Sequence, residues 1–220
     1  MQDSDQFTAR RPLKVRSNQL SQRCAKWLSQ KSITPNQISL LSVVFALGAG
    51  FCLLMSVQQP AYHAAWMIGA ALFIQMRLLC NLFDGMVAIE GGKSTASGEL
   101  FNDIPDRISD PIIIIAAGYS VLCLSWGETL GWLAAILAVL TAYVRTLAVS
   151  IGAPANFSGP MAKQQRMALL TIGCVVVAIE YHFWHHDYAL LIALIVMNIG
   201  CIWTLLRRTR IAYQYLENSH

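Results

Sequence analysis

Acidic and amide side chains recur at regular spacing inside otherwise apolar stretches of the chain. Asn81 and Asp84 lie near the end of one apolar run, in "NLFDG", and Asn102 and Asp106 lie at the start of the next. Polar groups of this kind are costly within a membrane, so they mark either a functional site or a structural pairing. Oxygen ligands that converge from two neighbouring segments suit a hard divalent cation such as Mg²⁺ or Mn²⁺.

Basic residues accompany these oxygen ligands. Arg77 shares a helical face with Asn81 and Asp84 at spacings of four and seven residues, and Arg145, Lys163 and Arg166 follow later in the chain. Guanidinium and ammonium groups bind phosphate, and the glycine-rich "EGGKSTASG" offers exposed backbone N–H groups. The set predicts a site for a metal–phosphate ligand. The structural alternative is that single acids, such as Asp110, pair with an arginine to hold helices together.

The elements that must position these residues are membrane helices. The chain has 220 residues, of which 55% are hydrophobic and only 13% are charged, with a mean hydropathy of +0.48, whereas a soluble domain carries about 25% charged residues. Six apolar runs are long enough for a bilayer core of about 30 Å; they cover residues 37–57, 64–88, 104–124, 129–151, 167–184 and 188–206. The six scattered cysteines predict no disulfide frame or zinc site.

The distribution of charge predicts the orientation of these helices. Lysine and arginine cluster before the first span and after the last, and the connections "SVQQPAYH", "SWGE" and "YHFWHHD" contain none. The positive-inside rule therefore places both termini and the acidic cluster on the cytoplasmic side. We expect an N-terminal segment with an amphipathic surface helix at 1–36, a six-helix all-α membrane domain at 37–208 and a cytoplasmic tail at 209–220. Clustering of the basic residues at the ends of the body argues against a nucleic-acid partner.

The spacing of the polar residues resembles the signature of the CDP-alcohol phosphotransferases, D-x2-D-G-x2-A-R-x8-G-x3-D-x3-D. The chain has Asn81-x2-Asp84-Gly85-x2-Ala88-Ile89-x8-Gly98-x3-Asn102-x3-Asp106, with every spacing kept. The segments "ITPNQISLLS" and "GPMAKQQRMALL" are also similar to the family, so the resemblance covers most of the chain.

The resemblance implies a fold, a reaction and a set of partners. It implies a membrane transferase that moves a phosphatidyl group from a CDP-activated lipid, such as CDP-diacylglycerol, to a small alcohol with release of CMP. The reaction would use Mg²⁺ or Mn²⁺ and would belong to phospholipid biosynthesis. The resemblance also implies that the protein forms a homodimer. The short chain favours a bacterial inner membrane.

The same resemblance assigns roles to single residues. It makes Asp84 a metal ligand and Asp106 both a ligand and the general base, with Asn81 and Asn102 at the two other ligand positions. It also places Gly85, Ala88 and Gly98 at the nucleotide and diphosphate pocket. From their charge alone, we expect Lys93 to bind phosphate and Arg145, Lys163 and Arg166 to bind the acceptor.

The chain departs from the signature at three positions. Asn81 and Asn102 replace aspartates, and Ile89 replaces the arginine. An amide oxygen can bind Mg²⁺ but brings no charge, so the departures favour one cation over two, with Asp103 as the best substitute ligand. Lys93 could restore the charge of the missing arginine. A catalytically inactive CDP-lipid binder stays open as the alternative function, and a transporter fits less well because the polar residues gather at one side.

Overall fold

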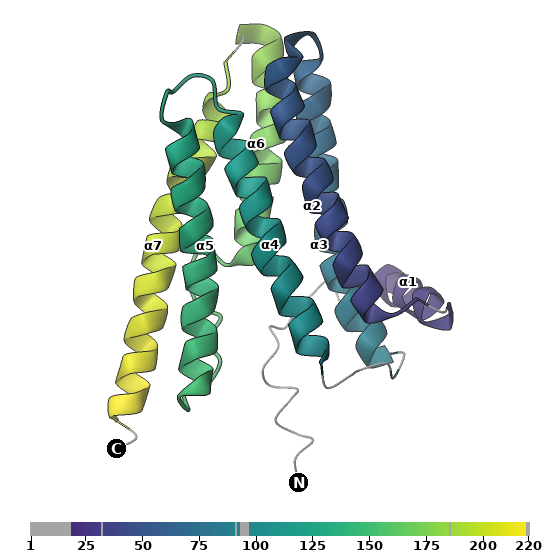
Figure 1. Ribbon diagram of the computed structural model, residues 1–220, viewed down its shortest axis with the longest axis vertical. Coiled ribbons are helices and arrows are strands. Elements are labelled where there is room, and N and C mark those ends of the chain that lie inside the picture. The colour runs from purple at the N-terminus through teal and green to yellow at the C-terminus, as the bar shows by residue number, and fades with distance from the viewer. Residues whose placement is uncertain (1–18, 32, 91, 93–96, 185, 219–220) are drawn as a thin grey trace.

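The computed structural model describes residues 19–31, 33–90, 92, 97–184 and 186–218. This part of the chain is helical apart from its connections (Figure 1). The helices are α1 (Gln19–Gln30), α2 (Pro35–Gln58), the 3-10 turn η2 (Pro60–Tyr62), α3 (His63–Glu90), α4 (Gly98–Tyr119), α5 (Gly127–Ser150), α6 (Lys163–Trp184) and α7 (Tyr188–Glu217).

The long helices form an integral membrane bundle. Five of the described helices, α2, α3, α5, α6 and α7, are long and apolar enough to cross a bilayer. Helix α4 corresponds to the predicted third span and lies among them, but it carries Asp103, Asp106 and Asp110. Large apolar side chains such as Leu47 on α2 and Ile199 on α7 are exposed on the outside of the bundle, as lipid contact requires.

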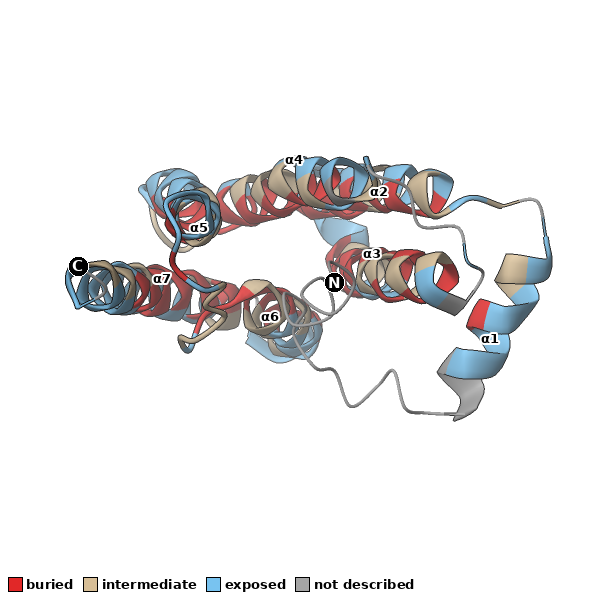
Figure 2. Ribbon diagram, turned by 90° about the horizontal axis from the view of Figure 1, so that it is seen from below, coloured by how far each residue is buried: buried red, intermediate tan, exposed pale blue. Residues whose placement is uncertain are grey.

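The six long helices enclose a common interior. In the view of Figure 2, α2, α4 and α5 form one layer and α3, α6 and α7 form the other, with the buried residues on the facing sides. The packed pairs close a ring in the order α2, α4, α5, α7, α6, α3 and back to α2. Helices α3 and α4 are therefore not neighbours in the ring. Their polar residues face each other across its interior.

Local sequence explains how two of these helices begin and pack. Thr34 caps α2, because its hydroxyl accepts from Gln37 N–H while the Gln37 side chain accepts from Thr34 N–H. Helix α2 therefore begins at Pro35, directly after this cap. Helices α4 and α5 approach closely where Gly118 meets Gly131, since a Cβ on Gly118 would lie 2.8 Å from the Gly131 Cα.

The predicted third span ends earlier in the structure, and most of the predicted C-terminal tail is helical. The span predicted at 104–124 is a helix at 98–119, because the carboxylate of Asp187 accepts from the N–H groups of Leu122 and Cys123 and holds residues 120–126 as a loop. Helix α7 continues to Glu217, through most of the segment expected to be a tail at 209–220. No proline or glycine interrupts "RRTRIAYQYLE", so the helix propagates beyond the apolar run.

Helix α1 packs beside the end of α3 (Figure 1). Its fully buried residue is Ala25, which packs with Leu82 and Met86. Cys24 and Trp27 of α1 are exposed. The small Ala25 lets the helix lie close to α3, which leaves the larger residues on the outside. The first 18 residues of the predicted N-terminal segment lie outside the described residues.

Candidate active site

The signature residues gather at one end of the bundle. Asp84 lies near the end of α3, and Asp106 lies in the first half of α4, which runs in the opposite direction. Helix α1 and the C-terminal end of α7 lie at the same end of the molecule (Figure 1). The structure thus brings the two halves of the signature to one region, on helices that face each other across the interior.

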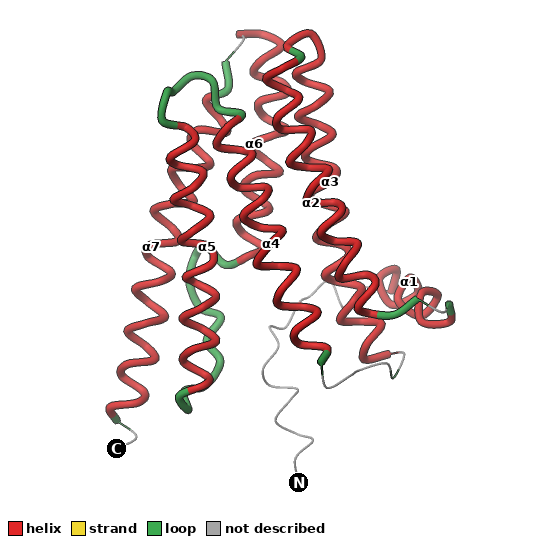
Figure 3. Tube along the Cα trace, viewed as in Figure 1, coloured by secondary structure: helices red, strands yellow, loops and turns green. Residues whose placement is uncertain are grey.

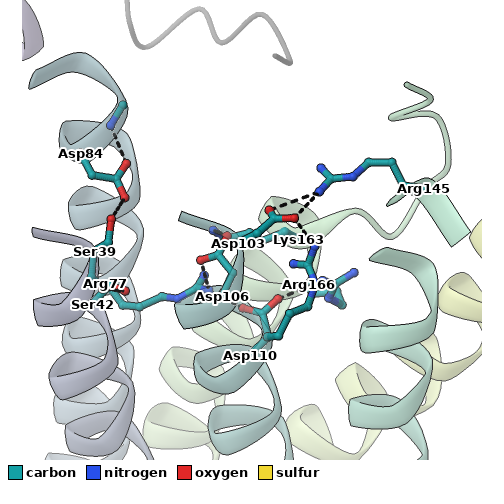
Figure 4. Close-up of polar contacts among 12 residues, drawn as sticks. Ser39, Ser42, Arg77, Asp84, Asp103, Asp106, Asp110, Arg145, Lys163 and Arg166 are labelled. Atoms are coloured by element: carbon teal, nitrogen blue, oxygen red, sulfur yellow. Dashed lines mark hydrogen bonds and ion pairs between the residues drawn. The ribbon is translucent and has the colours of Figure 1, made fainter. Parts of the chain in front are cut away.

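Asp84 is bound to helix α2. Ser39 Oγ donates a hydrogen bond of 2.6 Å to Asp84 Oδ2, and Gly85 N–H donates to Oδ1 (Figure 4). Both Ser39 and Asp84 are buried. Within the described residues Asp84 has no ion pair, so its remaining lone pairs are open to a cation.

Arg77 crosses the interior of the ring from α3 to α4. Its side chain is fully buried, and its Nη2 lies 3.0 Å from Asp106 Oδ1 and 2.6 Å from Asp110 Oδ1 (Figure 4). Arg77 lies one turn of α3 before Asn81 and two turns before Asp84. The helical face with the signature residues Asn81 and Asp84 therefore also presents the Arg77 guanidinium. The predicted common face of these three residues is confirmed.

Lys163 contacts the second oxygen of Asp106, because α6 begins part-way along the bundle. The connection 151–162 returns from the end of α5 to that level (Figure 3). Gly159, at a φ of +124°, makes a turn of this connection against Thr204, where a Cβ would lie 2.5 Å from the threonine methyl group. Met161 N–H then donates to Thr204 Oγ1 at 3.0 Å. This anchoring places the Lys163 ammonium on Asp106 Oδ2.

Asp103 is held by two arginines at the outer edge of the site. Arg107 Nη2 and Arg145 Nη2 lie 3.0 and 3.1 Å from Asp103 Oδ2. The guanidinium of Arg145 also lies 5.2 Å from the centre of the Phe157 ring, a cation–π arrangement. The side chains of Arg145 and Asp103 are partly exposed, so a substrate can reach them.

Arg166, expected to hold the acceptor, is a buried residue that joins helices. Its Nη2 donates to Asp110 Oδ2 at 2.9 Å and its Nη1 to the carbonyl of Met161 at 2.9 Å. Arg208 similarly binds the carbonyls of Thr141 and Ser158. With Arg77 on its other side, Asp110 lies between two buried guanidinium groups. The structural alternative considered for Asp110 therefore fits its surroundings.

The other predicted residues have mixed surroundings. Asn81 is partly exposed, but its Nδ2 is buried and makes no hydrogen bond to any described residue, whereas Asn102 is exposed at the start of α4. Gly85 and Ala88 are half-buried on α3, and Gly98 begins α4. Lys93 lies outside the described residues.

Two functional candidates were missed by the sequence reasoning. These are Ser39, which binds Asp84, and Arg107, which binds Asp103. Arg107 follows Asp103 by one helical turn and could have been predicted from that spacing. Ser39 gave no comparable signal, because a serine in an apolar helix is common and its partner is 45 residues away.

The oxygen ligands fit one divalent cation better than two. Within the described ranges, no group of three or more His, Cys, Asp or Glu side chains is close enough to hold a metal ion. Asp84 offers a carboxylate, and Asn81 offers an amide whose nitrogen end lacks a partner in the described part of the chain. Mg²⁺ commonly binds one or two carboxylates and completes its coordination with water and substrate phosphates. The donors present match that pattern.

A membrane bundle with acids, amides and cationic side chains at one end is the arrangement predicted for a metal–phosphate ligand at the membrane. Comparison with known proteins gives the family. The family profile of the CDP-alcohol phosphatidyltransferases matches residues 32–206. The chain belongs to this family, which confirms the resemblance drawn from the signature.

Individual relatives agree with this assignment. The inner membrane protein YnbA of Escherichia coli is 28% identical over 189 residues, which covers 84% of this chain and 86% of YnbA. The phosphatidylinositol phosphate synthase PgsA1 of Mycobacterium tuberculosis, crystallised with CDP-DAG, superposes with a TM-score of 0.75 at 17% identity, over 89% of this chain and 94% of PgsA1. The same enzyme with manganese and citrate gives a TM-score of 0.74 at 17% identity, over 88% of each chain. These matches confirm the expected fold.

Proposed function

We propose that the protein transfers a phosphatidyl group from a CDP-activated lipid, such as CDP-diacylglycerol, to a small alcohol and releases CMP. The observation that carries this proposal is the arrangement of the signature. Its two halves keep the family spacing, and their acidic residues meet at one end of the bundle among phosphate-binding cations. The family match over residues 32–206 supports the same reaction.

In this proposal the donor diphosphate lies between the ends of α3 and α4. Gly85 and Ala88 give it close access to α3, and the Asn81 Nδ2 group, which has no partner among the described residues, donates to a phosphate oxygen. A divalent ion held by Asp84 and the amide oxygens of Asn81 and Asn102 would neutralise charge that develops on the diphosphate. Manganese in the crystals of PgsA1 supports the choice of Mg²⁺ or Mn²⁺.

Asp106 serves as the general base. In the free protein both of its oxygens accept from cations, Oδ1 from Arg77 and Oδ2 from Lys163. The Lys163 side chain is partly exposed and flexible, so it moves to the diphosphate when substrate binds and frees Oδ2. Asp106 Oδ2 then takes the proton of the acceptor hydroxyl. The acceptor oxygen bonds to the lipid-linked phosphorus, and the bond from that phosphorus to CMP breaks.

The acceptor binds on the side of Arg145. This residue is partly exposed beside Asp103 and Phe157, whereas Arg166 is occupied by Asp110 and the Met161 carbonyl. The phosphate of a phosphorylated alcohol would replace the Asp103 carboxylate as the partner of the Arg145 guanidinium. We place the site and both termini on the cytoplasmic side, from the distribution of lysine and arginine. The similarity to the E. coli protein supports a bacterial inner membrane.

Two observations favour a second function, binding of CDP-lipid without catalysis. Both oxygens of Asp106 are engaged by cations, and two signature aspartates are amides. A protein that only binds the donor needs the nucleotide pocket and the cations but no free base. The two functions differ in whether CMP is released.

The test is an assay of the full chain reconstituted in vesicles that contain CDP-diacylglycerol. Mg²⁺ or Mn²⁺ and a panel of alcohols are added, including glycerol phosphate and inositol phosphate, and CMP is measured. Release of CMP that depends on one of the alcohols supports the transferase. Saturable binding of CDP-diacylglycerol without release of CMP for any alcohol would favour the binder and overturn the proposal.

A further inference from the structure

We propose that Arg77 is a built-in cation that replaces one of two divalent ions, so that the site binds a single metal ion per chain. This inference rests on the proposed function, because it concerns the charge that the site presents to the donor diphosphate. It starts from the position of Arg77, whose fully buried side chain reaches from α3 to Asp106 and Asp110 of α4.

The partners of the acidic residues divide the site into two parts. Within the described residues, Asp103, Asp106 and Asp110 each contact two cationic side chains. In the same part of the chain, Asp84 accepts hydrogen bonds from the hydroxyl of Ser39 and the N–H of Gly85 and contacts no cation. The α3 side therefore offers a carboxylate without a counter-charge. On the α4 side, the carboxylates are already neutralised by the protein.

The two amide residues of the signature, Asn81 and Asn102, also favour one ion over two. A second ion would need Asp106 together with carboxylates at the positions of Asn81 and Asn102, and these two residues supply no charge. The Asn81 Nδ2 is buried without a partner among the residues described, so this end of the side chain presents a donor suited to a phosphate oxygen rather than to a cation. The loss of acidic charge at 81 and 102 thus accompanies the presence of a fixed guanidinium at 77.

The guanidinium is not easily displaced. A charge in the interior of a membrane bundle must stay paired, and moving Arg77 away from Asp106 and Asp110 would leave its own guanidinium without a carboxylate partner and each carboxylate with a single cation. Nε and Nη1 of Arg77 are buried and make no hydrogen bond within the described ranges, so the group has donors left for an anion that enters the site. Arg77 therefore provides positive charge without an ion-binding equilibrium. A second ion bound through both oxygens of Asp106 would have to displace Arg77 from Oδ1 even after Lys163 has left Oδ2.

The test measures the number of Mn²⁺ ions bound per chain and does not depend on catalytic activity. Full-length protein in micelles is titrated with Mn²⁺ in the presence of CDP, and bound Mn²⁺ is measured by equilibrium dialysis and by electron paramagnetic resonance. We expect a single Mn²⁺ per chain with the spectrum of an isolated ion. Two ions per chain with a spin-coupled spectrum would overturn the inference, and so would the absence of specific binding.

Variants test the role of Arg77 directly. In Asn81→Asp/Asn102→Asp, we expect Mn²⁺ to bind at least tenfold more tightly but still as one ion, because Arg77 keeps Asp106 occupied. Adding Arg77→Met to that pair should allow a second, spin-coupled ion, and adding Arg207→Met, an exposed residue of α7, should not. A single ion in the folded triple variant that includes Arg77→Met would contradict the inference, as would two ions in the double variant. If the triple variant does not fold, the counts for the natural chain and the double variant decide.

These outcomes are separable from those of the proposed function. One bound ion with no release of CMP would contradict the proposed transferase activity but support the single-ion site. Release of CMP by a protein with two spin-coupled ions would support the transferase activity but contradict the proposed role of Arg77.

Discussion

Ser39 Oγ lies 2.6 Å from Asp84 Oδ2, so a hydroxyl on α2 fixes the carboxylate of α3 that has no cationic partner among the described residues. A hydrogen bond from a neighbouring residue orients a metal ligand, and its loss typically lowers metal affinity by about 10–100-fold. We therefore predict that Ser39→Ala weakens Mn²⁺ binding by at least about tenfold. Mn²⁺ titration with CDP present measures this change.

Ser42 provides a matched control for Ser39. It is buried one turn further along α2, and its hydroxyl donates to the Ser39 carbonyl of its own helix. Ser42→Ala should leave the Mn²⁺ affinity within about twofold, since its hydroxyl bonds to backbone rather than to a ligand. Equal losses in the two variants would show that the effect comes from α2 as a whole and would contradict the orienting role of Ser39.

Asp106→Asn should lower the rate of CMP release by about 10²-fold or more, which is the usual contribution of a general base. The amide keeps the shape of the side chain but cannot take a proton. Binding of CDP-diacylglycerol, measured separately, should change by only a few-fold. Glu128→Gln, an exposed carboxylate at the start of α5, is the control and should keep full activity. An Asp106→Asn protein that releases CMP at the natural rate would show that Asp106 is not the general base.

Arg166→Met should destabilise the bundle. It leaves Asp110 with Arg77 alone and removes the bond to the Met161 carbonyl, and breaking a buried pair of this kind costs about 3–5 kcal/mol. Arg145→Met, at a partly exposed pair with Asp103, should cost about 1 kcal/mol or less. Denaturation in micelles gives both free energies of unfolding. A smaller loss for Arg166→Met than for Arg145→Met would contradict the structural role of Arg166.

Gly118→Ala should separate α4 from α5. The added Cβ would lie 2.8 Å from the backbone Cα of Gly131, which cannot move alone, and overpacking of this kind costs about 1–3 kcal/mol. Gly48→Ala is the comparison, because the three atoms nearest to its Cβ belong to the Phe73 side chain, at 2.9 Å and beyond. A side chain can shift more readily than the backbone of a neighbouring helix, so this variant should lose less free energy of unfolding than Gly118→Ala. The same denaturation experiment distinguishes the two.

Much of the fold could be predicted from the sequence because membrane helices have simple requirements. Apolar runs of sufficient length located every long helix, and the capping residues around Thr34 fixed the start of α2. The C-terminal end of α4 could not be predicted. It depends on Asp187, a distant residue that accepts from the N–H groups of Leu122 and Cys123.

The helical faces that carry the signature could be predicted from the sequence, but the pairing of their charged residues could not. The spacing of Asn81, Asp84 and Asp106 placed them at one end of the bundle, since a helical face repeats regularly. Which cation contacts which acid depends on the ring of helices, where α3 and α4 face each other without being neighbours. Arg77 was therefore recognised as part of the face, while its bridge to Asp106 and Asp110 required the three-dimensional arrangement.

The most direct test of the transferase is the ratio of the two products formed from CDP-diacylglycerol in vesicles. Mass spectrometry would measure the new phosphatidyl-alcohol, and a nucleotide assay would measure CMP in the same sample. The account predicts equal amounts of both, which appear only when the acceptor alcohol is present and are lost in Asp106→Asn. Bound CDP-diacylglycerol that yields neither product with any alcohol, or CMP accompanied by phosphatidate instead of a phosphatidyl-alcohol, would contradict it.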